Sequence, residues 1–500
     1  MKKRELSNLQ ARRQFLQSSA ALAVAGLMPG FAFSASPIDN PLPIPELLSG
    51  ESVEGITRYQ LKAQYGRMNF FAGLSTPTLG YNGSYLGPTL RVRKGEKVNI
   101  QVKNELKEIT TVHWHGMILP ASMDGGPHQE IKPGASWNSS FQIHQPAATL
   151  FYHSHAHGNT GQQVYRGLAG LLIIDDEESL QLGLPTEYGV DDIPVIIQDR
   201  DFASDGSFNY LSFMSERMIG KHGKALLVNG ALSPVFKAQK TLLRLRLVNA
   251  SNARFYNLEF SDQRSFKVIA TDGGLLEKPV TLKRLPMAPA ERYEILLDVS
   301  DRKSVMLRST GGIGNASHGP MGMMGMDRAF DVLLIDAENA GRSNSKITER
   351  LVTYPDWSQA AVSANRSIEL QMGMGGMMQG MMGGGRGGMM KINGAAFDMN
   401  RIDFAVKKDS FEIWSVSNDS PMVHPFHVHN TQFRVLSRNG QKPPAIESGF
   451  KDTVIVNRDE TVNIMVPTGS YVDELHPYMY HCHILEHEDG GMMGQFVVKD

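Results

Sequence analysis

Three short segments of this chain repeat one pattern, and each follows an Asn-Gly pair at a similar distance. They read apolar, any, apolar, any, Asn: "IQVKN" at 100–104, "LRLVN" at 245–249 and "WSVSN" at 414–418. The Asn-Gly pairs begin at residues 82, 229 and 393. Alternating apolar positions are typical of half-buried strands, and Asn-Gly is typical of a tight turn between strands. Three copies of this arrangement constrain the chain to three similar β units.

The composition agrees with turn-rich β units. The chain has 500 residues, 41% of them apolar, with 49 Gly and 25 Pro. No segment sustains a helical period, so we predict an all-β protein of three Greek-key β-sandwich domains. The predicted domains are 36–180, 181–345 and 346–500, the last with a methionine-rich insert near 372–390.

The first 35 residues have the form of an export signal. "ARRQFLQ" at 11–17 precedes the apolar "AALAVAGLM" at 20–28, which is the pattern of a twin-arginine signal peptide. The apolar run is shorter than the ~20 residues that a membrane span needs. We therefore expect twin-arginine export to the periplasm. The chain carries a net charge of −1, and removal of the signal would make it more acidic, so neither nucleic-acid binding nor membrane insertion is expected.

The histidines are concentrated at the two ends of the chain. Among 16 histidines there are five His-x-His pairs: His113/His115, His153/His155, His155/His157, His427/His429 and His481/His483. On a strand both imidazoles of such a pair point to one face, which suits two metal ions side by side. Imidazole binds copper, zinc, iron or nickel, so the pairs alone leave the metal open.

The only cysteine lies inside one of these pairs, in "HCHILEHEDGGMM" at 481–493. A lone cysteine excludes an intrachain disulfide and leaves a buried thiol, a nucleophile or a metal ligand. Strand alternation points Cys482 away from its two neighbours. Cys482, His487 and Met492 supply three ligands of a His₂Cys-Met blue-copper site. His424 lies three residues before His427 and so faces away from the His427/His429 pair, which makes it the predicted fourth ligand.

Four motifs together resemble those of the multicopper oxidase family. They are "HWHG", "HSHAHG", "HPFHVH" and "HCHILEHEDGGMM". The segments "PLPIPELL" and "KINGAAFDMN" and the methionine-rich stretch before the latter are similar to the copper efflux oxidases of this family, which oxidise Cu(I) in the bacterial periplasm. The resemblance implies three cupredoxin-like domains and four copper ions, one of type 1, one of type 2 and two of type 3.

The resemblance also implies a role for each residue. The type 1 ligands would be His424, Cys482, His487 and Met492; the type 2 ligands His113 and His427; and the type 3 ligands His115, His153, His155, His429, His481 and His483. His157 has no ligand role in the pattern. Members of the family oxidise a reductant one electron at a time and reduce dioxygen to two waters. Asp124 and Glu488 match acids that the family places near the cluster as proton donors.

Methionines indicate the substrate. "MGMMGM" at 321–326 and the stretch at 372–390 hold 12 of the 27 methionines. Thioethers are soft ligands that select Cu(I). Copper efflux oxidases have an acid four residues before the first type 1 histidine, where this chain has Ser420, and the nearest acid is Asp419. We predict that Met372, Met377, Met378 and Met422 bind the substrate ion, with Asp419 joining them if a bulge turns its carboxylate inward.

Other interpretations remain open. A laccase would oxidise an organic phenol instead of Cu(I), and a cupredoxin-fold scaffold protein would have lost its copper. The complete set of ten histidines, Cys482 and Met492 argues against the scaffold, and the methionines favour the cuprous oxidase over the laccase. A two-domain copper nitrite reductase would need fewer repeats and fewer His-x-His pairs. A monomer is expected.

Overall fold

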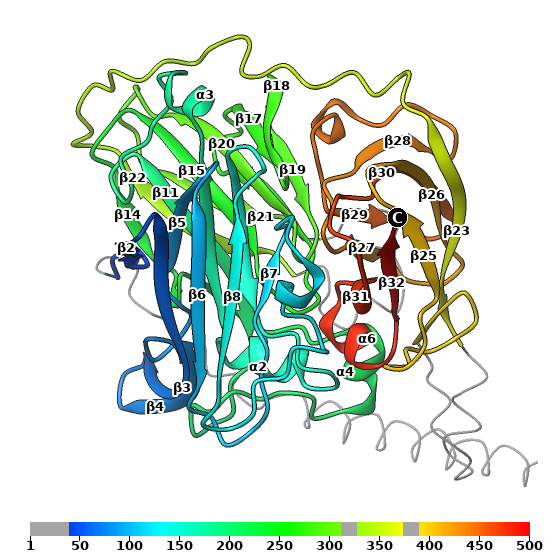
Figure 1. The fold of residues 1–500 in the computed structure, drawn as a ribbon. Coiled ribbons are helices and arrows are strands. Elements are labelled where there is room, and N and C mark those ends of the chain that lie inside the picture. Colours follow the sequence, from blue (N-terminus) through cyan, green and yellow to red (C-terminus); the bar gives the residue numbers. More distant parts are fainter. Residues whose placement is uncertain (1–39, 312–327, 374–389) are drawn as a thin grey trace, which may run out of the picture. The chain divides into compact units, whose positions relative to one another are not determined.

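A computed structural model describes residues 40–311, 328–373 and 390–500. The predicted signal peptide, the segment 321–326 and most of the insert at 372–390, with Met377 and Met378, lie outside these ranges. Within them the chain is built mainly of strands, which confirms the predicted all-β fold (Figure 1). No helix in the described ranges combines the length and apolar character needed to cross a bilayer.

The strands form six sheets, two from each third of the chain (Figure 1). The first third forms the sheet β1 (Leu47–Leu48), β5 (Thr89–Arg93), β10 (Ala169–Asp175), β9 (Ala148–His153), β7 (His113–His115), and the sheet β2 (Glu51–Val53), β3 (Ile56–Phe71), β6 (Lys97–Asn104), β8 (Ser136–Gln142), with β4 (Leu74–Tyr81) paired to β3.

The middle third forms the largest sheet. Its order is β13 (Ala231–Leu232), β12 (Ala225–Val228), β11 (Asp192–Arg200), β15 (Leu242–Asn249), β20 (Arg292–Asp298), β17 (Phe266–Thr271), β18 (Gly274–Leu282). The second sheet is β14 (Val235–Lys237), β22 (Phe330–Asp336), β21 (Val305–Ser309), β16 (Tyr256–Phe260), β19 (Arg284–Met287).

The last third repeats the two-sheet arrangement. One sheet is β24 (Met390–Ile392), β23 (Val362–Met372), β26 (Phe411–Asn418), β30 (Glu460–Pro467), β28 (Arg434–Arg438). The other is β25 (Phe404–Lys407), β32 (Met493–Lys499), β31 (Asp473–Cys482), β27 (His424–Val428), β29 (Thr453–Val456). The helical elements are short: α2 (Thr160–Arg166), α3 (Glu177–Leu180), α4 (Met214–Ile219), α6 (Leu485–Asp489), and the 3₁₀ turns η1 (Ala121–Met123) and η4 (Ala445–Glu447).

The three repeated segments occupy equivalent strands. They lie in β6, β15 and β26, each paired in parallel with an earlier strand of its own third (β3, β11 and β23) and antiparallel with a later one (β8, β20 and β30). The repeat in the sequence is therefore a repeat in topology.

The repeated asparagine ends each of these strands and organises the chain that follows. The side-chain oxygens of Asn104, Asn249 and Asn418 each accept the backbone N–H two residues later. Their amide groups each donate to two backbone carbonyls, one four or five residues later and one on a different segment. These buried polar contacts hold the strand end in place, which explains why the pattern requires asparagine.

The asparagine of each Asn-Gly turn binds the earlier strand of the two parallel strands. Asn82, Asn229 and Asn393 all have positive φ angles, between 51° and 57°. Their side-chain oxygens accept the backbone N–H groups of β3, β11 and β23 respectively. Asparagine tolerates this left-handed conformation better than most residues, so the pairs mark equivalent turns.

The apolar face of β15 packs into the core of the middle third, while its arginine face is buried against neighbouring strands. Leu243, Leu245 and Leu247 are 0% exposed. Arg246 donates to Asp192 and Glu294, and its Nη1 also reaches Thr149 of β9, 2.7 Å away. The paired charges of the middle third therefore contact the first third through a hydrogen bond to Thr149.

Replacement of one repeated asparagine tests its structural role. We expect Asn249→Ala to lower the free energy of unfolding by about 2 to 4 kcal/mol, because three buried backbone groups lose their partner. Chemical denaturation measures the change. Asn138→Ala, on the exposed face of β8, is the control and should change stability by less than about 0.5 kcal/mol. Equal effects of the two variants would contradict the role.

Candidate metal centre

Four strands and the segments that follow them bring the paired histidines together. His113 and His115 lie on β7 opposite His153 at the end of β9, with His113 and His153 directly paired. In the last third, His427 of β27 is opposite His481 of β31, and Phe426 is opposite Cys482. The ten histidines predicted as ligands and Cys482 are all at most 3% exposed. The first and last thirds therefore share one buried polar centre.

One group contains the cysteine. The Nδ1 atoms of His424 and His487 lie 3.2 and 3.7 Å from Cys482 Sγ and 3.3 Å from each other. Both Nε2 atoms point elsewhere: that of His424 is 2.6 Å from Ser420 Oγ, and that of His487 donates to the Met218 carbonyl at 2.9 Å. Two imidazole nitrogens and a sulfur thus converge on one point. Met492 is buried in the same hydrophobic cluster as Cys482.

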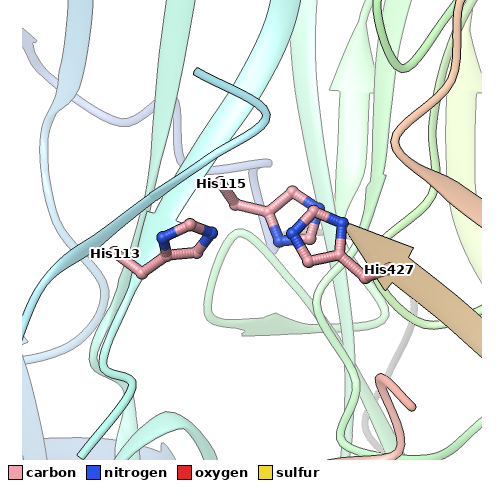
Figure 2. Close-up of side chains that lie close together, drawn as sticks. All are labelled: His113, His115 and His427. Atoms are coloured by element: carbon pink, nitrogen blue, oxygen red, sulfur yellow. The ribbon is translucent and has the colours of Figure 1, made fainter. Parts of the chain in front are cut away.

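A second set consists only of histidines. His115, His153 and His483 form one group, and His155, His429 and His481 form another. His113 and His427 lie together with His115 in a third (Figure 2). Figure 2 shows the rings of His115 and His427 face to face, with centroids 3.8 Å apart. His481 and His483 belong to different groups although one residue separates them, and that residue is Cys482.

The orientation of the rings fits bound cations. His113, His153, His427 and His481 each place Nδ1 against a backbone carbonyl oxygen, at 2.8 to 3.1 Å, which leaves Nε2 as the free lone pair. Nε2 of His113 and His427 and both nitrogens of His483 are buried with no hydrogen-bond partner. Buried polar atoms are rarely left unpaired, and metal-binding histidines use this carbonyl contact to fix their tautomer.

Burial favours the neutral form of the imidazoles, which is the form that binds a metal. It lowers the pKa of His153 and of His487 to about 4, so these two imidazoles are neutral at pH 7. Burial also raises the pKa of the Cys482 thiol. A cation that bound there would have to displace the thiol proton.

Both acids predicted from the sequence lie against the histidines. Asp124 Oδ2 accepts from Nδ1 of His429 at 2.7 Å. The two oxygens of Glu488 lie 3.3 Å from Nδ1 of His155 and of His481. Burial raises the pKa of Glu488 well above that of a free carboxyl group, so it can hold a proton beside the cluster.

Three other residues contact the histidines without a signal in the sequence. Ser420 and Met218 bind the outer nitrogens of the cysteine group, as described above. Asp452 lies 3.1 Å from Nε2 of His115. Burial raises the pKa of Asp452, and its contact with Arg292 opposes that shift. None of the three belongs to a His-x-His pattern, so only their packing identifies them.

The predicted substrate residues differ in burial and in contact with the cysteine cluster. Met372 ends β23, pairs with Met390 of β24, and packs against the cluster that holds Cys482. Met422 is buried in that cluster, at 4% exposure. Asp419 is exposed, directly after the end of β26. His157 is exposed in a turn, with its ring against Phe397.

Comparison with known proteins identifies the class. Family models described as "Multicopper oxidase" match residues 62–179, 214–322 and 362–500. The chain is 39% identical to multicopper oxidase mco of Staphylococcus haemolyticus over 469 residues, which covers 92% of this chain and 93% of that protein. It is 34% identical to cell division protein FtsP of Proteus mirabilis, over 98% of both chains.

A solved structure gives the same result. The laccase-like multicopper oxidase CueO of an Ochrobactrum species aligns with a TM-score of 0.81 at 37% identity, over 92% of this chain and all of that one. The chain therefore belongs to the multicopper oxidase family. It is an oxidoreductase of cupredoxin-like domains, with copper ions as cofactors and with dioxygen and a reductant as substrates.

Removal of the thiol tests the cysteine group. We expect Cys482→Ser to abolish the intense blue absorption of the copper-loaded protein, because a serine oxygen cannot replace thiolate charge transfer. The fold should survive, since serine is smaller and can still accept the Ile484 N–H that now points at the sulfur. Absorption and circular dichroism spectra measure both effects. A blue, active Cys482→Ser protein would contradict the assignment.

Proposed function

We propose that this multicopper oxidase oxidises Cu(I) to Cu(II), reduces dioxygen to water and serves copper detoxification. The observation that carries the proposal is the position of Cys482 between His481 and His483, because one tripeptide joins the cysteine group to both type 3 groups. Bound copper ions supply one-electron oxidation of the reductant and four-electron reduction of dioxygen, which no side chain here can perform. We assign four coppers, with the type 1, 2 and 3 ligands predicted from the sequence.

The side chains would orient the ions and manage protons. Carbonyl contacts on Nδ1 fix four imidazoles with Nε2 toward the cluster. We assign Asp124 and Glu488 as proton donors. Asp124 lies 2.7 Å from one cluster histidine, Glu488 lies 3.3 Å from two, and both acids are at most 1% exposed. Glu488 can act as a proton reservoir, since burial and the nearby Asp489 raise its pKa and favour its protonated form.

The methionines support Cu(I) as the reductant. Met372 and Met390 pair at the two ends of the methionine-rich insert, and both lie against the cluster that holds Cys482. Soft thioethers would therefore be anchored next to the type 1 group. We keep Met372, Met377, Met378 and Met422 as the substrate ligands. The exposed position of Asp419 favours a thioether site over one completed by that carboxylate.

The remaining predictions complete the proposal. We propose twin-arginine export of a monomer to the periplasm, cleavage of residues 1–35, and domains at 36–180, 181–345 and 346–500. The relative FtsP is named a cell division protein, which is a role other than oxidation. The burial of ten imidazoles and a thiol, whose side chains converge in groups of three, argues against a copper-free scaffold.

Oxygen uptake decides between the substrates. Steady-state rates with Cu(I) and with a neutral phenol, compared as kcat/KM, should favour Cu(I). A higher kcat/KM for the phenol would contradict the proposal and show that the protein is a laccase. No uptake with either reductant by the copper-loaded protein would favour the scaffold.

Two variants test the substrate ligands. We expect Met422→Leu to raise the KM for Cu(I) more than Asp419→Asn does, because leucine keeps the buried volume but removes the thioether. Both variants should keep the blue absorption, which shows that the type 1 group is intact. A larger effect of Asp419→Asn would show that the carboxylate binds the substrate ion.

A pocket favours phenol oxidation as a second candidate function. A cavity of about 460 Å³ is lined by Phe208 and Tyr210 together with Arg166 and Arg217. It shares Tyr210 and Arg217 with a smaller cavity of about 160 Å³ that reaches Glu486 and Asp489 of α6. Two lining residues are next in sequence to the surroundings of the cysteine group: Glu486 precedes His487, and Arg217 precedes Met218, whose carbonyl accepts the hydrogen bond from His487. Aromatic rings and two guanidinium groups suit a phenol with a carboxylate or sulfonate.

Removal of one positive charge tests this pocket. We expect Arg217→Gln to raise the KM for a sulfonated phenol about 10-fold, the effect of one lost charge-assisted hydrogen bond, and to leave the KM for a neutral phenol and for Cu(I) unchanged. Arg458→Gln, an exposed arginine that lines neither cavity, is the control. Equal changes for charged and neutral phenols would exclude the pocket as the docking site.

A further inference from the structure

Glu486 is a buried acid of the helix α6, one residue before His487, and it is 5% exposed. Its carboxylate accepts three hydrogen bonds. Tyr210 Oη donates to Oε1 at 3.0 Å, and Asn252 Nδ2 donates to the same oxygen at 2.8 Å. The backbone N–H of Lys221 donates to Oε2 at 3.0 Å. All three donors belong to the middle third, so Glu486 joins α6 to a domain that contributes no histidine pair.

Asn252 binds α6 at two points. Its Nδ2 donates both to Glu486 and to the Gly161 carbonyl, 2.9 Å away, and its own carbonyl accepts the backbone N–H of Leu485 at 3.0 Å. If the amide of Asn252 turned round, its oxygen would face two other oxygen atoms. The side chain is therefore fixed as a donor to Glu486.

The turn at 218–221, which follows α4, lies directly against the start of α6. Gly220 has a φ of 81°, and a Cβ at this position would lie 2.3 Å from Cβ of Ala253 and 2.7 Å from Cγ2 of Ile484. Only glycine fits there, in both conformation and space. The turn binds α6 on each side of this contact, because Lys221 donates to Glu486 and the Met218 carbonyl accepts from His487.

The side chain of Lys221 holds the turn from the other side. This side chain is 0% exposed, and its Nζ lies 2.5 Å from Oε1 of Glu216 on α4. The second oxygen of Glu216 accepts the backbone N–H of Phe213 at 3.1 Å, at the start of the same helix. The turn and α4 thus form one hydrogen-bonded unit whose outward N–H is directed at Glu486.

We propose that Glu486 is a positioning residue, which fixes α6 against the middle third and thereby sets the position of His487 in the type 1 group. A helix of five residues is too short to be stable alone, so contacts with other segments must hold it. The middle third then acts on the cysteine group without supplying a ligand. The inference rests on the proposed type 1 site but not on the identity of the reductant.

Amide hydrogen exchange in the metal-free protein tests the attachment of α6. A glutamine at 486 has one acceptor oxygen, so Glu486→Gln must turn its NH₂ group toward at least one of the three donors. We expect the Gly490 amide, which donates to the Glu486 carbonyl at the end of α6, to exchange at least about 10-fold faster in the variant. Unchanged exchange would overturn the proposal.

The electron paramagnetic resonance signal of the copper-loaded protein tests the consequence for the metal. We expect the type 1 signal of Glu486→Gln to be broader than that of the wild type, because the ring of His487 is less firmly oriented. Faster exchange in α6 with an unchanged type 1 signal would overturn the positioning role. A wild-type protein without any type 1 signal would instead contradict the proposed copper site and leave the exchange result valid.

The matched control is Glu412→Gln. Glu412 is also a buried acid with three donors, two from Arg366 and one from Trp414, and none of these residues belongs to α6 or the turn at 218–221. This control should lower stability and leave both the exchange of α6 and the type 1 signal as in the wild type. Equal changes in the two variants would show a general loosening and overturn the proposal. If Glu486→Gln does not fold, Tyr210→Phe removes one of the three bonds and must still speed the exchange of α6.

Discussion

The alternation of side chains along β31 and the residues that follow it determines how the rest of the centre is built. Because successive residues of a strand face opposite sides, Cys482 points into the core of the last third while His481 and His483 point the other way, with ring centroids 5.5 Å apart. β27 mirrors this arrangement: His424 joins the cysteine, and His427 and His429 join the histidines. Two separate sites thus lie on the two faces of one sheet, a single residue apart in the chain.

Burial has a cost that the surroundings of the histidines offset. Buried imidazoles and a buried thiol must be neutral or paired, and burial lowers the pKa of histidines such as His113 and His481, which favours their neutral form. Each outward-facing nitrogen then needs an acceptor. Carbonyl oxygens meet this need at four histidines, Asp124 at His429 and Asp452 at His115. Among the described residues, Nε2 of His113, Nε2 of His427 and both nitrogens of His483 are left without a hydrogen-bond partner, which fits a site that holds cations.

The cysteine group and the histidine cluster are buried in different surroundings. The cysteine group is covered by residues of other segments: Ser420 on one histidine and the Met218 carbonyl, at the end of α4, on the other. Met422 lies in the hydrophobic cluster that holds Cys482, and Met372 packs against that cluster. The histidine cluster is enclosed by three domains, and its acids Asp124, Glu488 and Asp452 are at most 1% exposed.

The sequence by itself determined the fold class, because strand alternation, the Asn-Gly turns and the repeated asparagine are local properties that recur three times. The four histidine motifs, which are also local, indicated the family. The sequence also grouped His424 with Cys482 and His487, since a spacing of three residues on a strand reverses the face. It could not identify Met218, Arg292 or Asp452. These residues act through contacts between segments that are far apart in the sequence. Asp452, for example, contacts His115, 337 residues away, and Arg292, 160 residues away. Only tertiary packing creates such contacts, because no local pattern records which carbonyl or carboxylate will face a buried nitrogen.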